Sequence, residues 1–260
     1  MEGYDPTAYG AGIADVYDDL YRDDDMATAA TVRRLLDLAG GGPVLELGVG
    51  TGRLALPLAA AGLRVHGIDA SQEMLDRLAA KPGSADIDAT LGDFSSFEVP
   101  GRFALAVLAF NTIFALPDQD AQVRCFECVA AHLQPGGAFV VEAFVPNPVR
   151  FQEGQSVRLR TMTSERVALD VARIDPVTQF MYTTQVDLRD GAVRLHAANH
   201  RYAWPAELDL MARIAGLELE NRWQDWDQTA FTATSQFHIS VYRKTSPAAG
   251  GREARTPPGE

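Results

Sequence analysis

Residues 44–53 read Val44-Leu45-Glu46-Leu47-Gly48-Val49-Gly50-Thr51-Gly52-Arg53, an apolar strand that runs into a turn with glycine at every second position. Glycine lets the backbone take left-handed conformations and lets a ligand approach the main chain closely. The spacing is G-x-G-x-G, whereas the turn that holds the pyrophosphate of a dinucleotide is G-x-G-x-x-G. With acidic Glu46 just ahead of it, this turn favours a cofactor that carries an ammonium group and no phosphate.

Outward from this turn, apolar strands alternate with helical segments, the pattern of a parallel sheet with helices on both faces. Because such connections are almost always right-handed, we expect a doubly wound, Rossmann-like α/β fold with a mainly parallel seven-stranded sheet. The expected strands are 44–47, 64–68, 87–91, 103–110, 138–145, 217–226 and 236–242, and the expected helices are 9–21, 26–38, 54–61, 71–80, 118–133 and 205–216.

Residues 157–200 show a different pattern, in which apolar and polar residues mostly alternate and turns fall at Asp175-Pro176 and Asp190-Gly191. This predicts a half-exposed antiparallel sheet, inserted after the fifth strand. Its surface would contact the substrate or build a homo-oligomer. We therefore divide the chain into an N-terminal helical lid (1–40), a core (41–150 and 203–244), the inserted antiparallel sheet (151–202) and a disordered tail (245–260).

The composition narrows the class of protein. The 260 residues include 35 acidic and 23 basic ones, which leaves a net charge of -12. Such a chain repels phosphate backbones and anionic lipids, so nucleic acid and membrane are poor candidates for partners. There are 2 cysteines, no basic-then-apolar leader and no apolar run of about 18 residues, so we expect a cytoplasmic protein. Cys125 and Cys128 fall inside a predicted helix without a second pair, and we expect them to pack there and to bind no metal.

Two acidic residues follow the next strands of the expected sheet. Asp69 ends the second strand, where a carboxylate can accept hydrogen bonds from both hydroxyls of a ribose. Asp93, in Gly92-Asp93-Phe94 after the third strand, could accept from an adenine amino group with Phe94 beside the ring, or could cap a helix. A fourth motif, Leu133-Gln134-Pro135-Gly136-Gly137, precedes the fifth strand.

Together these motifs resemble the class I S-adenosylmethionine (SAM)-dependent methyltransferases, strongly over 36–145 and moderately over 204–242. ELGVGTGRL is similar to their first motif, HGIDAS to the second, GDF to the adenine motif and LQPGGAFVVEAF to the loop and fifth strand. The resemblance implies SAM as cofactor, with the glycines of the turn at its methionine moiety. The cofactor-binding candidates are Glu46, Gly48, Gly50, Gly52, Asp69, Met74, Asp93, Phe94 and Phe110.

Two of these candidates have an alternative role. Glu46 could pair with a neighbouring arginine instead of facing the cofactor. By the resemblance Met74 packs on the adenine face, although a methionine at such a position is as often part of the plain core.

The inserted sheet resembles that of bacterial amino-sugar and antibiotic N-methyltransferases, with the lincosamide enzymes as a plausible near relative. In many small-molecule members an N-terminal helix closes over the cofactor, and Tyr9 and Tyr17 match its tyrosines, as catalytic candidates or as core anchors. Asn111 and Phe114, after the fourth strand, would face the acceptor, Phe114 as an apolar wall. Glu142, in the fifth strand, would be a catalytic partner of the substrate amine or a charge buried by pairing.

The sequence assigns no general base. Some amino-sugar members carry a histidine shortly after the fourth strand, but Phe114-Ala115-Leu116 stands there in this chain. His196, His200 and His238 fall on late strands. Each could point into the substrate cavity or be a satisfied structural histidine.

The expected reaction is transfer of the SAM methyl group to a small-molecule substrate. The sulfonium methyl is already activated, so the enzyme mainly holds the nucleophile in line and excludes water. An amine needs only its free lone pair, whereas an alcohol needs a stronger base or a metal, which favours nitrogen over oxygen. The alternatives are O-methylation, an NAD-type oxidoreductase, and a methyltransferase-fold protein that binds without turnover.

Overall fold

The computed structural model describes Asp18 and residues 25–245, and its centre is a seven-stranded sheet in the order β10-β11-β5-β4-β1-β2-β3. The first five strands pair in parallel, and the last two run antiparallel at one edge. The expected mainly parallel α/β fold is thus confirmed. The strands are β1 (Val44–Leu47), β2 (Val65–Asp69), β3 (Ile87–Leu91), β4 (Phe103–Leu108), β5 (Leu133–Phe144), β10 (Leu217–Trp223) and β11 (Phe237–Lys244).

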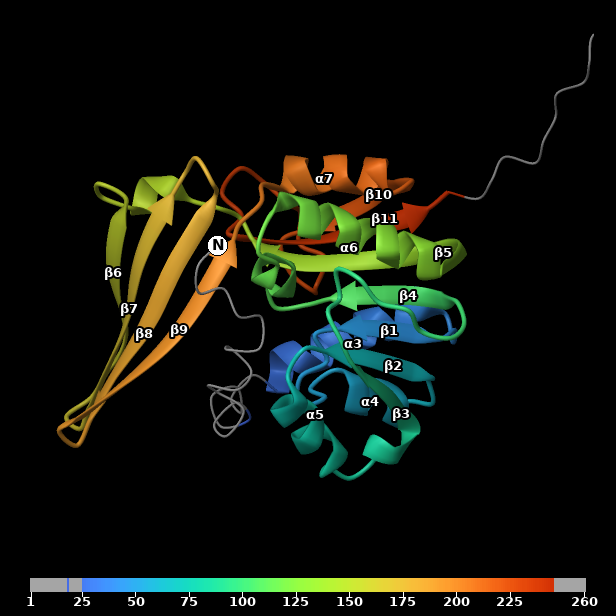
Figure 1. Ribbon diagram of the computed structural model, residues 1–260, viewed down its shortest axis with the longest axis horizontal. Coiled ribbons are helices and arrows are strands. Elements are labelled where there is room, and N and C mark those ends of the chain that lie inside the picture. Colours follow the sequence, from blue (N-terminus) through green and yellow to red (C-terminus); the bar gives the residue numbers. More distant parts are fainter. Residues whose placement is uncertain (1–17, 19–24, 246–260) are drawn as a thin grey trace, which may run out of the picture.

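Helices cover both faces of this sheet, and each layer has its own apolar core (Figure 1). The helices are α3 (Asp25–Ala39), α4 (Ala55–Ala60), α5 (Gln72–Ala79), α6 (Gln119–His132) and α7 (Pro205–Ile214), with 3-10 turns η2 (Ser84–Asp86), η3 (Thr112–Ala115) and η4 (Pro148–Arg150). Leu35 and Leu58 belong to the core under α3 and α4, and Phe126 and Leu208 to the core under α6 and α7.

Local sequence signals account for where these helices begin. Ser71 Oγ accepts a hydrogen bond from the Met74 N–H at 3.3 Å at the start of α5. Asp118 Oδ1 accepts from the Ala121 N–H at 2.7 Å at the start of α6. Pro205 is the first residue of α7. These residue types satisfy or remove the free N–H groups of a first turn, which is why the helix starts can be predicted.

Several strand ends differ from those expected, and two of the differences have a clear structural cause. β5 begins at Leu133, earlier than expected, because Leu133 pairs with Phe103 and the following Pro-Gly-Gly stretch is absorbed by a shift in the pairing register. β4 ends at Leu108 instead of continuing through position 110, because Phe110 and Asn111 both adopt left-handed conformations, with φ of 59° and 65°.

A second, four-stranded antiparallel sheet follows β5, as predicted, and projects to the left in Figure 1. Its strands, in order across the sheet, are β6 (Gln155–Met162), β7 (Arg166–Asp175), β8 (Phe180–Arg189) and β9 (Ala192–Arg201). One face exposes large apolar side chains such as Val157 and Leu195, and the other carries Ile174 and Met181, which pack against the core. Most of the predicted lid that precedes α3, and nearly all of the predicted tail, lie outside the described residues.

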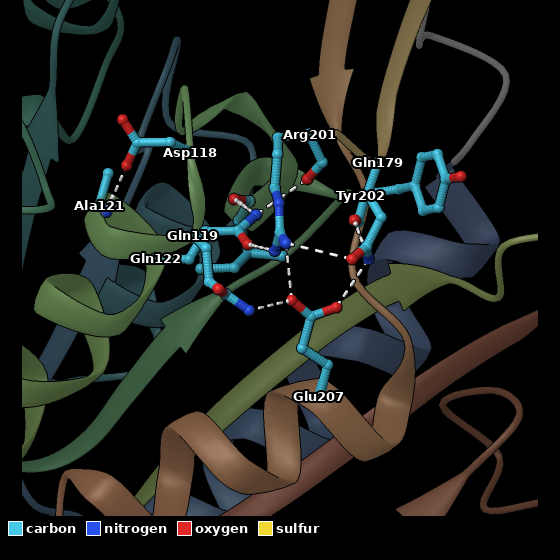
Figure 2. Close-up of polar contacts among 9 residues, drawn as sticks. Asp118, Gln119, Ala121, Gln122, Gln179, Arg201, Tyr202 and Glu207 are labelled. Carbon is cyan, nitrogen blue, oxygen red and sulfur yellow. Dashed lines mark hydrogen bonds and ion pairs between the residues drawn. The ribbon is translucent and has the colours of Figure 1, made fainter. Parts of the chain in front are cut away.

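A buried ion pair joins the two sheets (Figure 2). Arg201, at the end of β9, has a side chain only 6% exposed, and its Nη2 lies 2.7 Å from Oε1 of Glu207 in α7. Its Nη1 donates to Oε1 of Gln122 in α6 at 2.6 Å. Gln179, just before β8, also donates to Glu207 at 2.7 Å. The four side chains come from four different segments, so this junction links the base of the second sheet to α6 and α7.

The described residues contain no helix long and apolar enough to cross a bilayer. Within the same residues there is no group of three or more His, Cys, Asp or Glu side chains that could hold a metal ion. Cys125 and Cys128 are free thiols in α6, and burial raises the pKa of the Cys125 thiol.

Candidate active site

The glycine turn lies where the strand order reverses, between β1 and β4, which is where α/β sheets commonly bind ligands. Gly48 has φ of +75°, and a Cβ there would lie 2.6 Å from Thr112 Cγ2, so only glycine allows this close approach to η3. At Gly50, where φ is +54°, a Cβ would meet no atom within 4 Å. The turn therefore borders open space at Gly50.

Asp69, the last residue of β2, holds the turn in position. Its Oδ2 accepts from the Gly50 N–H at 2.7 Å, and its Oδ1 accepts from the Ser71 N–H at 2.9 Å. Burial raises the pKa of this carboxyl, and the backbone donors oppose the rise. Each carboxylate oxygen has a second lone pair, so Asp69 can accept further hydrogen bonds from a ligand beside the turn.

A cavity between the turn and the segment after β4 encloses about 340 Å³, part of it open to solvent. Oε2 of Glu46 is buried there without a hydrogen-bond partner. Burial raises the pKa of Glu46 to about 8, with Arg53 opposing the rise and Asp69 adding to it. A buried carboxyl group of this kind is suited to a cationic ligand. The cavity is lined by Glu46, Gly48, Val49, Arg53, Leu54, Ala109, Phe110 and Thr112.

Arg53 was not among the predicted site residues, yet it brings a positive charge to the same cavity. Its guanidinium lies 4.1 Å from the centroid of the Phe110 ring, and Nη1 donates to Thr28 Oγ1 at 3.0 Å. The cavity therefore carries one acidic and one basic side chain, the pair that complements the zwitterion of an amino acid. The sequence feature that could have indicated Arg53 is a basic residue directly after the last glycine of the turn.

The bend at Phe110 and Asn111 is held by Glu142 of β5. The Phe110 N–H donates to Glu142 Oε2 at 2.9 Å, and Trp226 Nε1–H donates to Glu142 Oε1 at 2.8 Å. The Phe144 N–H donates to Asn111 Oδ1 at 2.7 Å. Two adjacent non-glycine residues at positive φ cost free energy unless their surroundings hold them. Each carboxylate oxygen of Glu142 therefore accepts one hydrogen bond from a neutral donor of the protein.

The two predicted substrate residues lie in different environments. Asn111 is half-buried in the bend beside the cavity. Phe114 is fully buried, and its ring packs on that of Phe144 with centroids 4.8 Å apart. Phe114 therefore belongs to the core behind the bend and does not line the cavity.

The predicted adenine contacts are next to Asp69. The Gly92 N–H donates to the Asp69 carbonyl oxygen at 2.9 Å, which brings Asp93 beside the end of β2. Asp93 is exposed, and its Oδ1 accepts from the Ser95 N–H at 2.8 Å, a local turn. Met74 and Phe94 are 3% and 8% exposed, so most of their surface is already covered by protein.

Asp18 contacts the glycine turn. Its Oδ1 accepts from Thr51 Oγ1 at 2.6 Å and from Lys81 Nζ at 3.0 Å. Lys81 Nζ also donates to the Thr51 carbonyl oxygen at 2.8 Å. Tyr9 and Tyr17 lie outside the described residues, so their roles stay predictions.

The chain is similar to several known methyltransferases. A profile of the methyltransferase domain matches residues 44–137. A cypemycin N-terminal methyltransferase from Streptomyces sp. is 32% identical over 209 residues, which cover 78% of this chain and 84% of that protein. The structure of the CcbJ methyltransferase from Streptomyces caelestis is 41% identical, with a TM-score of 0.86 over 94% of this chain and 100% of that one. A SAM-bound amino pentose methyltransferase from Micromonospora echinaspora shares the fold at 21% identity, with a TM-score of 0.68 over 88% of this chain and 97% of that one.

Proposed function

This chain belongs to the SAM-dependent methyltransferases, and from that premise we propose that it methylates an amine nitrogen of a small natural product or amino-sugar-like metabolite. The observation that carries the proposal is the unpartnered Oε2 of Glu46, in a cavity that Arg53 also lines. SAM bears an ammonium and a carboxylate group on one carbon. In our proposal the ammonium binds Glu46 and the carboxylate binds Arg53.

The remaining cofactor contacts follow from the elements around the turn. Asp69 accepts from the ribose hydroxyls through the lone pairs that its two backbone donors leave free. Asp93, exposed beside the end of β2, accepts from the adenine amino group. Phe94 and Met74, which are nearly covered already, support the adenine site from the protein side. The open space at Gly50 admits the ligand close to the backbone.

When bound, SAM supplies a methyl group that passes to the acceptor lone pair as the sulfur–carbon bond breaks. The residues of this chain contribute by positioning the acceptor. Glu142 and Trp226 fix the bend at Phe110 and Asn111, which gives the acceptor a rigid wall to lie against, and we assign Glu142 to this positioning role. Tyr9 and Tyr17, which lie outside the described residues, keep the role of proton acceptors for the amine that the resemblance implies.

Nitrogen as the methylated atom is supported by the relative at 32% identity, which is named as an N-terminal methyltransferase, because a peptide N-terminus is an amine. We therefore expect release of S-adenosylhomocysteine (SAH) from SAM with amino sugars and alkylated cyclic amines. Analogues in which a hydroxyl replaces the amine should give only the background rate. Mass spectrometry of the products locates the methyl group. Turnover of the hydroxyl analogues alone would overturn the assignment to nitrogen.

Cofactor binding at pH 7 should release a proton from Glu46. Because burial raises its pKa to about 8, Glu46 is protonated in the free protein, and an ammonium beside it favours the carboxylate. Affinity for SAH should therefore rise with pH, by at most about tenfold per unit, and level off above about pH 8. Calorimetry in buffers of different ionisation enthalpy counts the protons. The amino group of SAH can also exchange a proton on binding, and the Glu46→Gln variant measures that contribution alone. If both proteins released the same number of protons, the Glu46 contact would be refuted.

The same raised pKa has a consequence for the stability of the free protein. A group whose pKa is higher in the folded than in the unfolded state makes stability fall as the pH rises from its unfolded value near 4.5 toward about 8. Glu46→Gln should remove this fall, so the free variant should unfold at a higher temperature than the parent protein at pH 8.

We also propose that the exposed face of the four-stranded sheet joins copies of this chain. Val157, Val193 and Leu195 are 70%, 60% and 64% exposed there, and the strand register puts them on one face. Leu195→Glu should shift the mass measured by light scattering from an oligomer to the monomer. Val177→Glu, in the turn between β7 and β8 where Val177 is 90% exposed, is the matched control and should leave the oligomer intact. A monomeric parent protein would refute this interface.

A further inference from the structure

Two polar atoms on the core-facing side of the four-stranded sheet are buried without hydrogen-bond partners. They are Nδ1 of His200 in β9 and Oγ1 of Thr183 in β8. His200 pairs with Met181, two residues from Thr183 in β8, so both side chains lie on the same face. Buried polar groups in native proteins nearly always have partners, and leaving two side by side without any calls for a ligand as explanation.

The same face continues into an apolar cavity. Met181 pairs with Ile174 of β7, and both line a space of about 220 Å³ together with Phe144 and Phe151. That volume includes space open to solvent, so the cavity is a half-open apolar recess that can cover one side of a short alkyl chain or a single ring. The cavity thus offers an apolar subsite directly beside the two unpartnered polar atoms.

This face is continuous with the cofactor site through Phe144. The Phe144 ring lies 6.3 Å from the His200 ring, centroid to centroid, and its backbone N–H donates to Asn111 Oδ1. β9 also packs against η3, which begins at Thr112 of the cofactor cavity. Asn111 and Phe144 therefore connect the cofactor cavity with the His200 side chain.

His238 in β11 also has one buried nitrogen without a hydrogen-bond partner, Nε2, but its ring is fully enclosed by the core and its Nδ1 bonds with Ser240 Oγ at 2.9 Å. His200 is only half-buried as a residue, and no side-chain partner orients it. Burial lowers its pKa to about 4, which a backbone interaction at Ala198 only partly offsets, so the ring is neutral at pH 7. A neutral imidazole can orient a hydroxyl or an amine without adding charge.

We propose that this face binds the methyl acceptor, with His200 and Thr183 hydrogen-bonding its polar part and the cavity at Met181 and Ile174 holding an alkyl or aryl substituent. The inference rests on the proposed function and narrows it. The acceptor is an amine that carries an apolar group, and a wholly hydroxylated amino sugar lacks the substituent that the cavity takes.

Phenethylamine, which joins an amine to one aromatic ring, is the probe, and saturation-transfer NMR on the SAH-loaded protein is the measurement. Its dissociation constant should rise about tenfold in Thr183→Val and in His200→Leu, as expected for the loss of one hydrogen bond. Met181→Trp, which fills the cavity, should abolish the saturation-transfer signal from the aromatic ring of phenethylamine. Thr184→Val, on the opposite face of β8, is the matched control and should change nothing.

A second readout does not depend on the probe. Because Oγ1 of Thr183 and Nδ1 of His200 are buried without hydrogen-bond partners, Thr183→Val and His200→Leu should unfold at temperatures no lower than the parent protein. Lower unfolding temperatures, or phenethylamine binding that all the variants retain, would overturn the acceptor face. Absence of heat from SAH in the parent protein would instead overturn the proposed function, so the two failures are distinguishable.

Discussion

Replacing Asp69 by Asn should weaken SAH binding about 100-fold, which corresponds to about 3 kcal/mol. The carboxylate accepts two backbone N–H groups, and in our proposal it also accepts two ribose hydroxyls. Asparagine removes the charge and places an NH₂ group against the Gly50 or the Ser71 N–H, so one donor faces another. The turn and the ribose contact are then disturbed together. Calorimetry with SAH measures the loss.

Asp76→Asn is the matched control, because Asp76 is an exposed carboxylate of α5 whose Oδ1 accepts from Gln72 Nε2 at 2.7 Å. It should bind SAH like the parent protein. Circular dichroism of the Asp69 variant should show the same helix and strand content as the parent, because the sheet does not depend on this side chain. Retention of SAH affinity within about threefold in Asp69→Asn would refute the assignment of Asp69 to the cofactor.

The features that could be predicted from the sequence are local ones. β1 is buried at every position, and a short apolar run ended by glycine is the mark of such a strand. Asp69 could be located because it ends the next strand and the parallel order of the sheet brings that end to the turn. The helix starts at Ser71 and Asp118 follow from residue type alone.

The features that were missed depend on contacts between distant segments. Trp226 donates to Glu142 across 84 positions of sequence, and no local pattern indicates that pair. The left-handed bend at Phe110 follows from the same contact, because the Glu142 carboxylate holds its N–H, so the strand was predicted too long. Arg53 stood in the motif that decides the fold, but its position over the Phe110 ring depends on that bend.

The junction in Figure 2 was missed in part for the same reason, because Gln122 lies 79 positions before Arg201, although Arg201 and Glu207 are six apart. Burial acts to raise the pKa of Glu207, but hydrogen bonds from Gln179 and Arg201 outweigh burial and lower the pKa. Because the pKa of Glu207 is lower in the folded than in the unfolded protein, ionised Glu207 stabilises the fold. This stabilisation is complete above the unfolded pKa near 4.5 and is lost as the pH falls through the folded pKa. The ion pair therefore contributes fully at neutral pH.

Arg201→Met should destabilise the protein by about 3–5 kcal/mol at pH 7, because it leaves the Glu207 carboxylate buried without its cation. Without Arg201, burial is opposed only by the hydrogen bonds from Gln179 and Gln119, so the pKa of Glu207 rises relative to the parent protein and the destabilisation should shrink as the pH falls toward about 4. Urea unfolding at both pH values measures it. Adding Glu207→Leu to this variant removes the unpaired carboxylate and should restore most of the lost stability.

Arg166→Met breaks a pair of the same chemistry with Asp187, farther out along the four-stranded sheet, where the two side chains are 27% and 19% exposed. Arg166→Met should lower the free energy of unfolding by less than about 1 kcal/mol, because water screens that ion pair. Equal losses in the Arg166 and Arg201 variants would contradict the special role of the junction. A double variant no more stable than Arg201→Met alone would show that the loss comes from the missing packing of the arginine side chain and not from the stranded carboxylate.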